Sequence, residues 1–129
     1  MQHFCKEVCA DNVKDAMRAV DLGANRIEYC SNLSEEGLTP DIEDVKYLLK
    51  NINIPLRIMI RPHSKSFNYS EQDISTILRD ISTFKKIGID GIVIGCLNND
   101  DEIDLKKINL LTEKARPLKV IFHKAIDMT

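Results

Sequence analysis

The sequence lacks the features by which several classes of protein are recognised. Its 18 Lys and Arg nearly balance 20 Asp and Glu, giving a formal net charge of -2, and no run of basic residues occurs along the 129 residues. Without such a run there is no cluster of phosphate contacts, which argues against a nucleic-acid partner. No stretch approaches 18 apolar residues, and no charged segment followed by an apolar one opens the chain, so we expect no membrane partner. The sequence predicts a soluble, cytoplasmic protein with a single domain over residues 1–129.

Paired-cysteine motifs and glycine-rich nucleotide loops are missing as well. The four cysteines, Cys5, Cys9, Cys30 and Cys96, follow no zinc-finger or disulfide-scaffold spacing, and in a reducing cytoplasm we expect free thiols. No Gly-x-Gly-x-x-Gly or P-loop sequence follows any apolar run, which removes the usual reason to favour a nucleotide-binding open sheet.

What the sequence contains is a regular alternation of short β-branched runs and longer segments of helical period. Five runs are predicted as strands: 4–9, 25–30, 56–61, 91–95 and 119–123. Four segments are predicted as helices, with N-cap candidates at Asp11, Ser70 and Asp104: 11–22, 42–50, 71–87 and 104–115. The segments LGANRIE and IGIDGIV, beginning at residues 22 and 87, are near copies with glycine where a helix should end. This order predicts an α/β fold with a parallel sheet.

The two faces of the predicted strands differ in chemistry. Side chains alternate at period two along a strand, and one face is apolar: Val8, Ile27, Tyr29, Leu56, Ile58 and Ile60. The other face is polar or sulfur-bearing: Glu7, Cys9, Arg26, Glu28, Cys30, Arg57, Met59 and Arg61. An open doubly wound sheet is apolar on both faces, so the pattern favours a TIM-type barrel with a polar interior.

The length covers only part of such a barrel. A (β/α)8 barrel takes about 250 residues, so the five predicted strands correspond to roughly the first four and a half units. Either the missing units lie beyond the given chain, or two copies associate to cover the open strand edges. We expect association, which predicts a homo-oligomer.

Two cysteines form a candidate metal site. Cys9 and Cys30 both end a predicted strand and share the polar face, so on neighbouring strands their thiolates reach one soft ion. Two thiolates suit Cu(I) better than zinc, which takes four ligands or three and a water. The alternatives are a pair of small buried hydrophobic residues or a disulfide.

Ionisable side chains are also concentrated at the predicted strand ends, where parallel α/β folds place their sites. Glu7 and Glu28 are candidate catalytic acids or bases, Arg61 is a candidate anion clamp, and His123 with Asp127 is a candidate proton-transfer pair. Alternatively, Arg26, Glu28, Arg57 and Arg61 form a buried ion-pair lattice with Glu7 that fixes the strand register, and His123 is a core histidine. The loop at 62–70 is interpreted as a rim over these strand ends.

Six motifs resemble those of the CutC family, often called copper homeostasis proteins. They span the chain in order: EVC at 7–9, GANRIEYC at 23–30, EGLTP at 36–40, MIRP at 59–62, DGIVIG at 90–95 and FHKAIDMT at 122–129. The resemblance implies a cytosolic TIM-barrel protein, usually oligomeric, linked to copper handling and in some members binding Cu(I) through cysteines. Cys9 and Cys30 stand at the cysteine positions of the first two motifs.

The sequence departs from the family pattern at two places that concern anions. HSKS at 63–66 replaces a basic residue and glycines, and Lys124 replaces an arginine, which loses a bidentate donor. Arg61 and Lys124 remain anion-binding candidates. Two functions are therefore carried forward: binding of copper as Cu(I) by Cys9 and Cys30, or an enzyme acting on a small phosphate or carboxylate at the strand ends. Whether the chain is an enzyme stays open.

Overall fold

The computed structural model describes residues 6–100 and 102–122. Strands and helices alternate along the chain: β1 (Glu7–Ala10), α1 (Val13–Asp21), β2 (Arg26–Tyr29), the 3-10 helix η1 (Leu33–Glu35), α2 (Ile42–Asn51), β3 (Leu56–Met59), α3 (Glu71–Lys86), β4 (Gly91–Ile94), α4 (Leu105–Ala115) and β5 (Lys119–Phe122). Every predicted strand and helix is present, although several begin or end at other residues than predicted. The predicted α/β class is confirmed.

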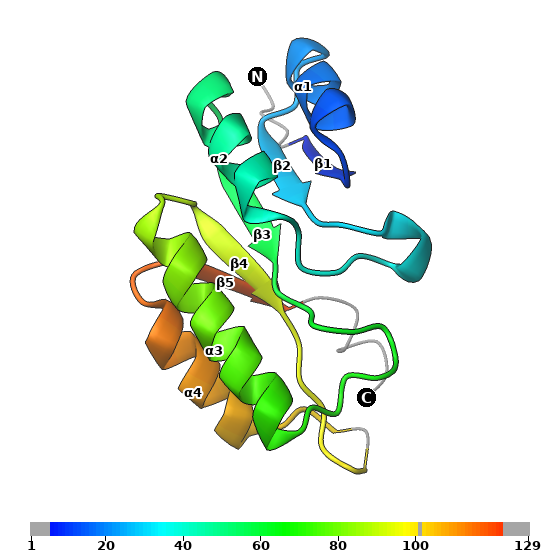
Figure 1. The fold of residues 1–129 in the computed structure, drawn as a ribbon, viewed down its shortest axis with the longest axis vertical. Coiled ribbons are helices and arrows are strands. Elements are labelled where there is room, and N and C mark those ends of the chain that lie inside the picture. Colours follow the sequence, from blue (N-terminus) through cyan, green and yellow to red (C-terminus); the bar gives the residue numbers. More distant parts are fainter. Residues whose placement is uncertain (1–5, 101, 123–129) are drawn as a thin grey trace, which may run out of the picture.

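The five strands form one parallel sheet in the order β1-β2-β3-β4-β5 (Figure 1). Every strand therefore pairs with its successor in the chain, and the connecting helices lie along one face of the sheet. A doubly wound sheet reverses its strand order and carries helices on both faces, whereas sequential parallel strands covered on one face form part of a (β/α) barrel.

The main hydrophobic core lies between the sheet and the helices. The apolar strand face supplies Ile27, Ile58 and Ile92, each fully buried. From the helices, α3 presents Ile74, Ile77, Ile81 and Phe84 at the spacing of one helical face. Burying each such side chain contributes roughly 1.5–3 kcal/mol, so this layer fixes which face of the sheet is left to line the interior.

Local sequence signals position the helix ends. Ser70 and Asp73 form a capping box on α3, and Asp104 caps α4, as predicted. The predicted cap of α1 was wrong by one residue: Asn12 accepts from the Asp15 amide, and Asp11 instead accepts from the Leu33 amide at 3.1 Å.

Glycines end two of the helices and permit a close strand approach. Gly23 and Gly88, in the repeated segments, have φ of +99° and +95° directly after the C-caps of α1 and α3, a conformation that suits glycine. At Gly91 a Cβ would lie 2.7 Å from the Lys119 carbonyl oxygen, so only glycine permits the observed spacing of β4 and β5.

Candidate functional site

The helix-free face of the sheet carries the polar side chains that the alternation predicts. Parallel register pairs Glu7 with Arg26, Cys9 with Glu28, and Glu28 with Arg57. Residues in register lie side by side on one face, about 4.8 Å apart between neighbouring strands. We call this the inner face, because it is the face that lines the interior of a barrel.

Charged side chains near the amino ends of the strands form a connected network, here called the ion-pair row. It begins at Glu7, whose carboxylate accepts from Arg26 at 3.1 and 3.3 Å and lies 4.0 Å from Arg57. Arg57 also donates to Asp90 at 3.3 Å, and Lys119 lies 3.8 Å from the same carboxylate. Of the ion lattice expected as the alternative, the contacts of Arg26 and Arg57 with Glu7 are present and partly exposed, whereas Arg61 donates to carbonyls of the following loops.

Glu28 lies one step further along the strands, beside Cys9. Burial raises the pKa of Glu28, and the charge of Glu7 raises it further, while Arg57 and Arg26 oppose that shift. Cys9 is exposed, yet desolvation of its sulfur, followed by the charges of Glu28 and Glu7, raises its pKa to about 11. At neutral pH Cys9 is therefore a thiol and not a reactive thiolate.

Cys30 follows β2 directly and is buried, with 2 % of its surface exposed. Its sulfur donates to the Ala10 carbonyl at 3.7 Å. Burial, followed by the charges of Asp11, Cys9 and Glu28, raises its pKa to about 12. Both Cys9 and Cys30 are free thiols, and the charge of an ionised Cys9 is among the causes that raise the pKa of Cys30.

Arg61 is engaged with the loops that follow β2 and β3. Its Nη1 donates to the carbonyls of Glu35 and Gly37 at 2.9 and 3.2 Å, and its backbone amide donates to Thr39 Oγ1 at 2.8 Å. The guanidinium carbon lies 4.7 Å from the centre of the Phe67 ring, a cation–π contact. The residue predicted as an anion clamp therefore holds residues 35–39 against the end of β3.

Two polar atoms beside this contact have no hydrogen-bond partner within the described residues: Arg61 Nε and Tyr69 Oη. Burial raises the pKa of Tyr69 well above its ordinary value, and the neighbouring Arg61 guanidinium opposes the shift. The two residues are 5 % and 2 % exposed. Buried polar atoms of this kind are normally satisfied by protein or by ordered water.

The predicted rim loop at 62–70 is attached to α3. His63 Nε2 lies 3.1 Å from the Asp73 carboxylate, and the ring contacts Tyr69 edge to face. The Ser70 amide is the main group that lowers the pKa of Asp73, and His63 adds to the effect. The loop thus joins the helix cap to the end of β3.

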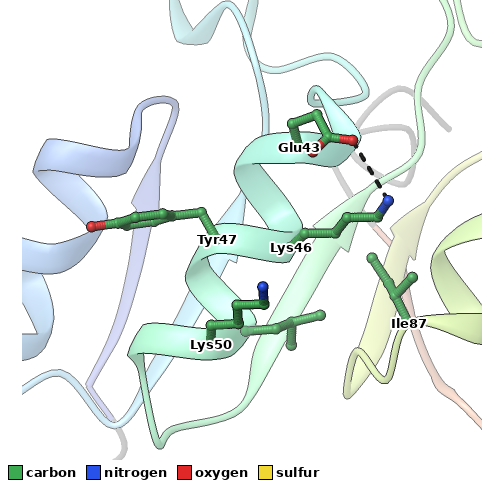
Figure 2. A pocket seen from close by; sticks show the side chains of 6 residues that line it. Glu43, Lys46, Tyr47, Lys50 and Ile87 are labelled. Carbon is green, nitrogen blue, oxygen red and sulfur yellow. Dashed lines mark ion pairs between the residues drawn. The ribbon is translucent and has the colours of Figure 1, made fainter.

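A pocket of about 480 Å³ lies on the opposite, helix-bearing side. Figure 2 shows that it opens between α2 and the end of α3, with Lys46 beside Glu43 and the Ile87 side chain on the other wall. Its lining comprises Glu43, Lys46, Tyr47, Leu49, Lys50 and Ile87. None of the residues predicted from the sequence lines it.

The structure brings together only some of the predicted site residues. Glu7, Cys9, Glu28 and Cys30 share the inner face, whereas His123, Lys124 and Asp127 lie outside the described residues. Sequence reasoning missed Asp90 and Lys119 as members of the ion-pair row. A signal for Asp90 was available in the sequence, because it stands directly before the predicted strand at 91–95. In the structure its carboxylate meets Arg57 of the neighbouring strand β3.

The described residues hold neither a ready-made multi-ligand metal group nor a membrane-spanning helix. In residues 6–100 and 102–122, no three His, Cys, Asp or Glu side chains come together as a metal-binding group. Within the same residues no helix has the length and apolarity to cross a membrane.

The fold and the inner face define the first part of a parallel (β/α) barrel whose interior is lined by ion pairs and thiols. The CutC family model matches residues 4–129, so the chain belongs to the CutC family. The predicted resemblance is confirmed.

Individual relatives agree with this assignment. The chain is 42% identical over 125 residues to the copper homeostasis protein cutC homolog of Homo sapiens, covering 97% of this chain and 46% of that protein. A CutC family protein of Vibrio atlanticus is 42% identical over 123 residues, covering 94% and 50%. The crystal structure of a CutC protein from Streptococcus agalactiae superposes with a TM-score of 0.89 at 30% identity, covering 98% of this chain and 61% of that one. The chain spans about half the length of the curated relatives it matches.

Proposed function

We propose that this chain acts in copper homeostasis and binds Cu(I), as cargo, through the thiolates of Cys9 and Cys30. The human relative carries the name of a copper homeostasis protein, which supports the role. The observation that carries the proposal is the position of the two thiols on adjacent strand ends of one face. Cytoplasmic location and a homo-oligomer stay predictions.

The register favours a bridging ion over a disulfide. Cys9 is paired with Glu28 and not with Cys30, so the two cysteines are one strand apart and two residues out of step. At about 4.8 Å between strands and 3.3 Å per residue, their Cα atoms are about 8 Å apart. Cysteines more than about 7 Å apart are not bridged directly, whereas an interposed ion lengthens the bridge by two metal–sulfur bonds of about 2.3 Å each.

The donor set fits a soft monovalent ion. Thiolate sulfur favours copper as Cu(I). Two thiolates suit the low coordination number of Cu(I), whereas zinc takes four ligands, or three and a water. Both thiols are protonated at neutral pH because their pKa values are about 11 and 12. Copper therefore binds by displacing two protons, and Glu28 beside Cys9 is placed to accept one of them.

A competition titration tests the proposal. Cu(I) is titrated against a chromogenic chelator for the wild type and for Cys9→Ser/Cys30→Ser. Cys96→Ala serves as the matched control, because Cys96 is a buried free thiol away from the inner face. We expect the double variant to bind at least about 100-fold more weakly and Cys96→Ala to bind as the wild type does. Equal weak affinity in all three proteins contradicts the proposal.

A second candidate function is favoured by the unsatisfied atoms Arg61 Nε and Tyr69 Oη. An oxygen of a small phosphate or carboxylate placed between them accepts from both donors, which supports the enzyme-like alternative at this end of the sheet. Phosphate titration followed by NMR tests it, with Tyr69→Phe as the variant. If the wild type and Tyr69→Phe show the same absence of saturable shifts around Arg61, this candidate is discarded.

A further inference from the structure

A third sulfur atom lies in the row that contains Cys30. Tyr29 is in register with Ile58, so the next residues along each strand, Cys30 and Met59, are neighbours on the inner face. They are 2 % and 6 % exposed and form a small buried cluster with Val93, separate from the main core. Met59 is the last residue of β3, level with Cys30 and two residues beyond Arg57, which shares the level of Cys9.

The position of Gly37 shows that Met59 and Cys30 meet at their sulfur ends. A Cβ placed on Gly37 would lie 3.2 Å from Cys30 Sγ and 3.3 Å from Met59 Cε. The Met59 thioether sulfur is one bond from that methyl carbon. The thiol of Cys30 and the end of the Met59 side chain therefore converge on the same point beneath the loop.

The loop over this point is held by Arg61. The guanidinium donates to the carbonyls of Glu35 and Gly37, and Gly37 itself has a φ of +97°. Because residue 37 has no side chain, the loop covers the two sulfur groups closely without displacing them. The cover lies over the buried cluster, whereas Cys9, on the neighbouring strand β1, is exposed.

A thioether in this position has a chemical consequence. Methionine sulfur is neutral, needs no deprotonation and prefers Cu(I) to the harder divalent ions. An apolar core position is also satisfied by leucine, which fills a similar volume, so volume alone does not require sulfur here.

We propose that Met59 is a third sulfur ligand, which together with Cys9 and Cys30 makes a three-sulfur Cu(I) site on the inner face. This inference rests on the proposed function. Two S–H bonds break, two copper–thiolate bonds form and two protons leave to solvent or to Glu28, while Met59 adds a neutral lone pair. No change of oxidation state is involved.

Selenomethionine labelling tests the inference without altering the fold. The chain has four methionines, and X-ray absorption at the selenium and copper edges of the Cu(I)-loaded full chain reports any copper–selenium bond. We expect such a bond in the labelled wild type and its loss in Met59→Leu. In Met17→Leu, the matched control on α1, we expect the bond to persist.

Affinity provides the second readout. Met59→Leu is expected to bind Cu(I) about tenfold more weakly than the wild type, and Met17→Leu equally well. One outcome overturns the Met59 assignment alone. In that outcome the labelled wild type shows copper–sulfur scattering without a selenium neighbour, and Cys9→Ser/Cys30→Ser loses the copper–sulfur scattering. Absence of copper–sulfur scattering in the wild type overturns the proposed function itself, so the two failures are distinguishable.

Discussion

The inner face has two halves with opposite chemistry. In the ion-pair row, at the amino ends of the strands, Glu7 and Asp90 are each shared by two cations. Toward the carboxyl ends, Cys30 and Met59 bring sulfur atoms with no formal charge at neutral pH, and Cys9 lies between the two sets, in register with Glu28. The charges of the first set are paired within the row, whereas in the second set Cys30 Sγ donates a weak hydrogen bond to the Ala10 carbonyl.

This difference separates structural from functional use of the same face. Arg57, with a side chain that is 12% exposed, has a carboxylate on each side of it, from Glu7 and Asp90, as expected for a charge with low exposure. The row links side chains of β1, β2, β3 and β5 with Asp90, directly before β4. Any metal ion that binds the thiols has to displace their protons, because both are protonated at neutral pH.

The largest expected effect is the loss of the ion-pair row. Arg57→Ala leaves Glu7 with one guanidinium and Asp90 with only the exposed Lys119, so we expect the free energy of unfolding to fall by about 3 kcal/mol. Arg116→Ala is the control, because its pair with Glu113 is 72% and 71% exposed, and it should cost at most about 0.5 kcal/mol. Urea denaturation measures both, and similar losses would contradict a structural role for the row.

The thiols predict that copper affinity and protein stability both depend on pH, in opposite directions. Their folded pKa values of about 11 and 12 exceed the ordinary 9.0, so copper affinity should rise up to about 100-fold per pH unit between pH 6 and 8, as two protons are displaced. The same shift means that the thiols stabilise the fold below pH 9 and that this contribution is lost as the pH rises through 9 toward 11. Copper titrations at several pH values, and denaturation of Cys9→Ser above pH 9, measure the two effects. A pH-independent affinity would rule out displacement of protons.

A smaller effect is expected where the loop covers the sulfur cluster. Gly37→Ala and Gly23→Ala both place alanine at a positive φ, +97° and +99°, but only at residue 37 does the new Cβ meet neighbours. Each should lose about 1–2 kcal/mol from backbone strain, and Gly37→Ala about 1 kcal/mol more from overpacking against Cys30. Thermal and urea denaturation of Gly37→Ala and Gly23→Ala measures the extra loss of stability that overpacking causes at residue 37. Identical losses would mean that the loop does not press on the cluster.

The smallest effect tests whether an exposed cation in the ion-pair row stabilises the fold less than a buried one. Lys119 shares the Asp90 carboxylate with Arg57, but it lies 3.8 Å away with its side chain 65% exposed. We expect Lys119→Ala to change the free energy of unfolding by less than about 0.5 kcal/mol. A loss as large as that of Arg57→Ala would show that the carboxylate depends on both cations.

The fold was predictable from the sequence because strand alternation has a fixed period. Glu7, Arg26 and Arg57 stand at positions whose neighbours, Val8, Ile27 and Ile58, are apolar, and that pattern alone distinguishes a one-sided sheet. The site was less predictable because register is a property of two strands. Cys9 lies opposite Glu28, and no single strand contains that information.

Arg61 illustrates a second limit of the sequence. Its place at a strand end suggested an anion clamp, yet its hydrogen bonds run to carbonyls contributed by residues 24 and 26 positions earlier in the chain. Backbone carbonyls are present at every residue and carry no sequence signature, so such a partner becomes visible only in three dimensions.

The contacts of Arg61 also join loops that are distant in the chain. Its carbonyl accepts from the Thr39 amide, its guanidinium stacks on Phe67, and the Phe67 carbonyl accepts from the Leu97 amide. The segments that follow β2, β3 and β4 are therefore linked in series. We therefore expect the amides of Thr39 and Leu97 to exchange as one cooperative unit, so that a single opening of these loops would expose the buried Cys30 thiol.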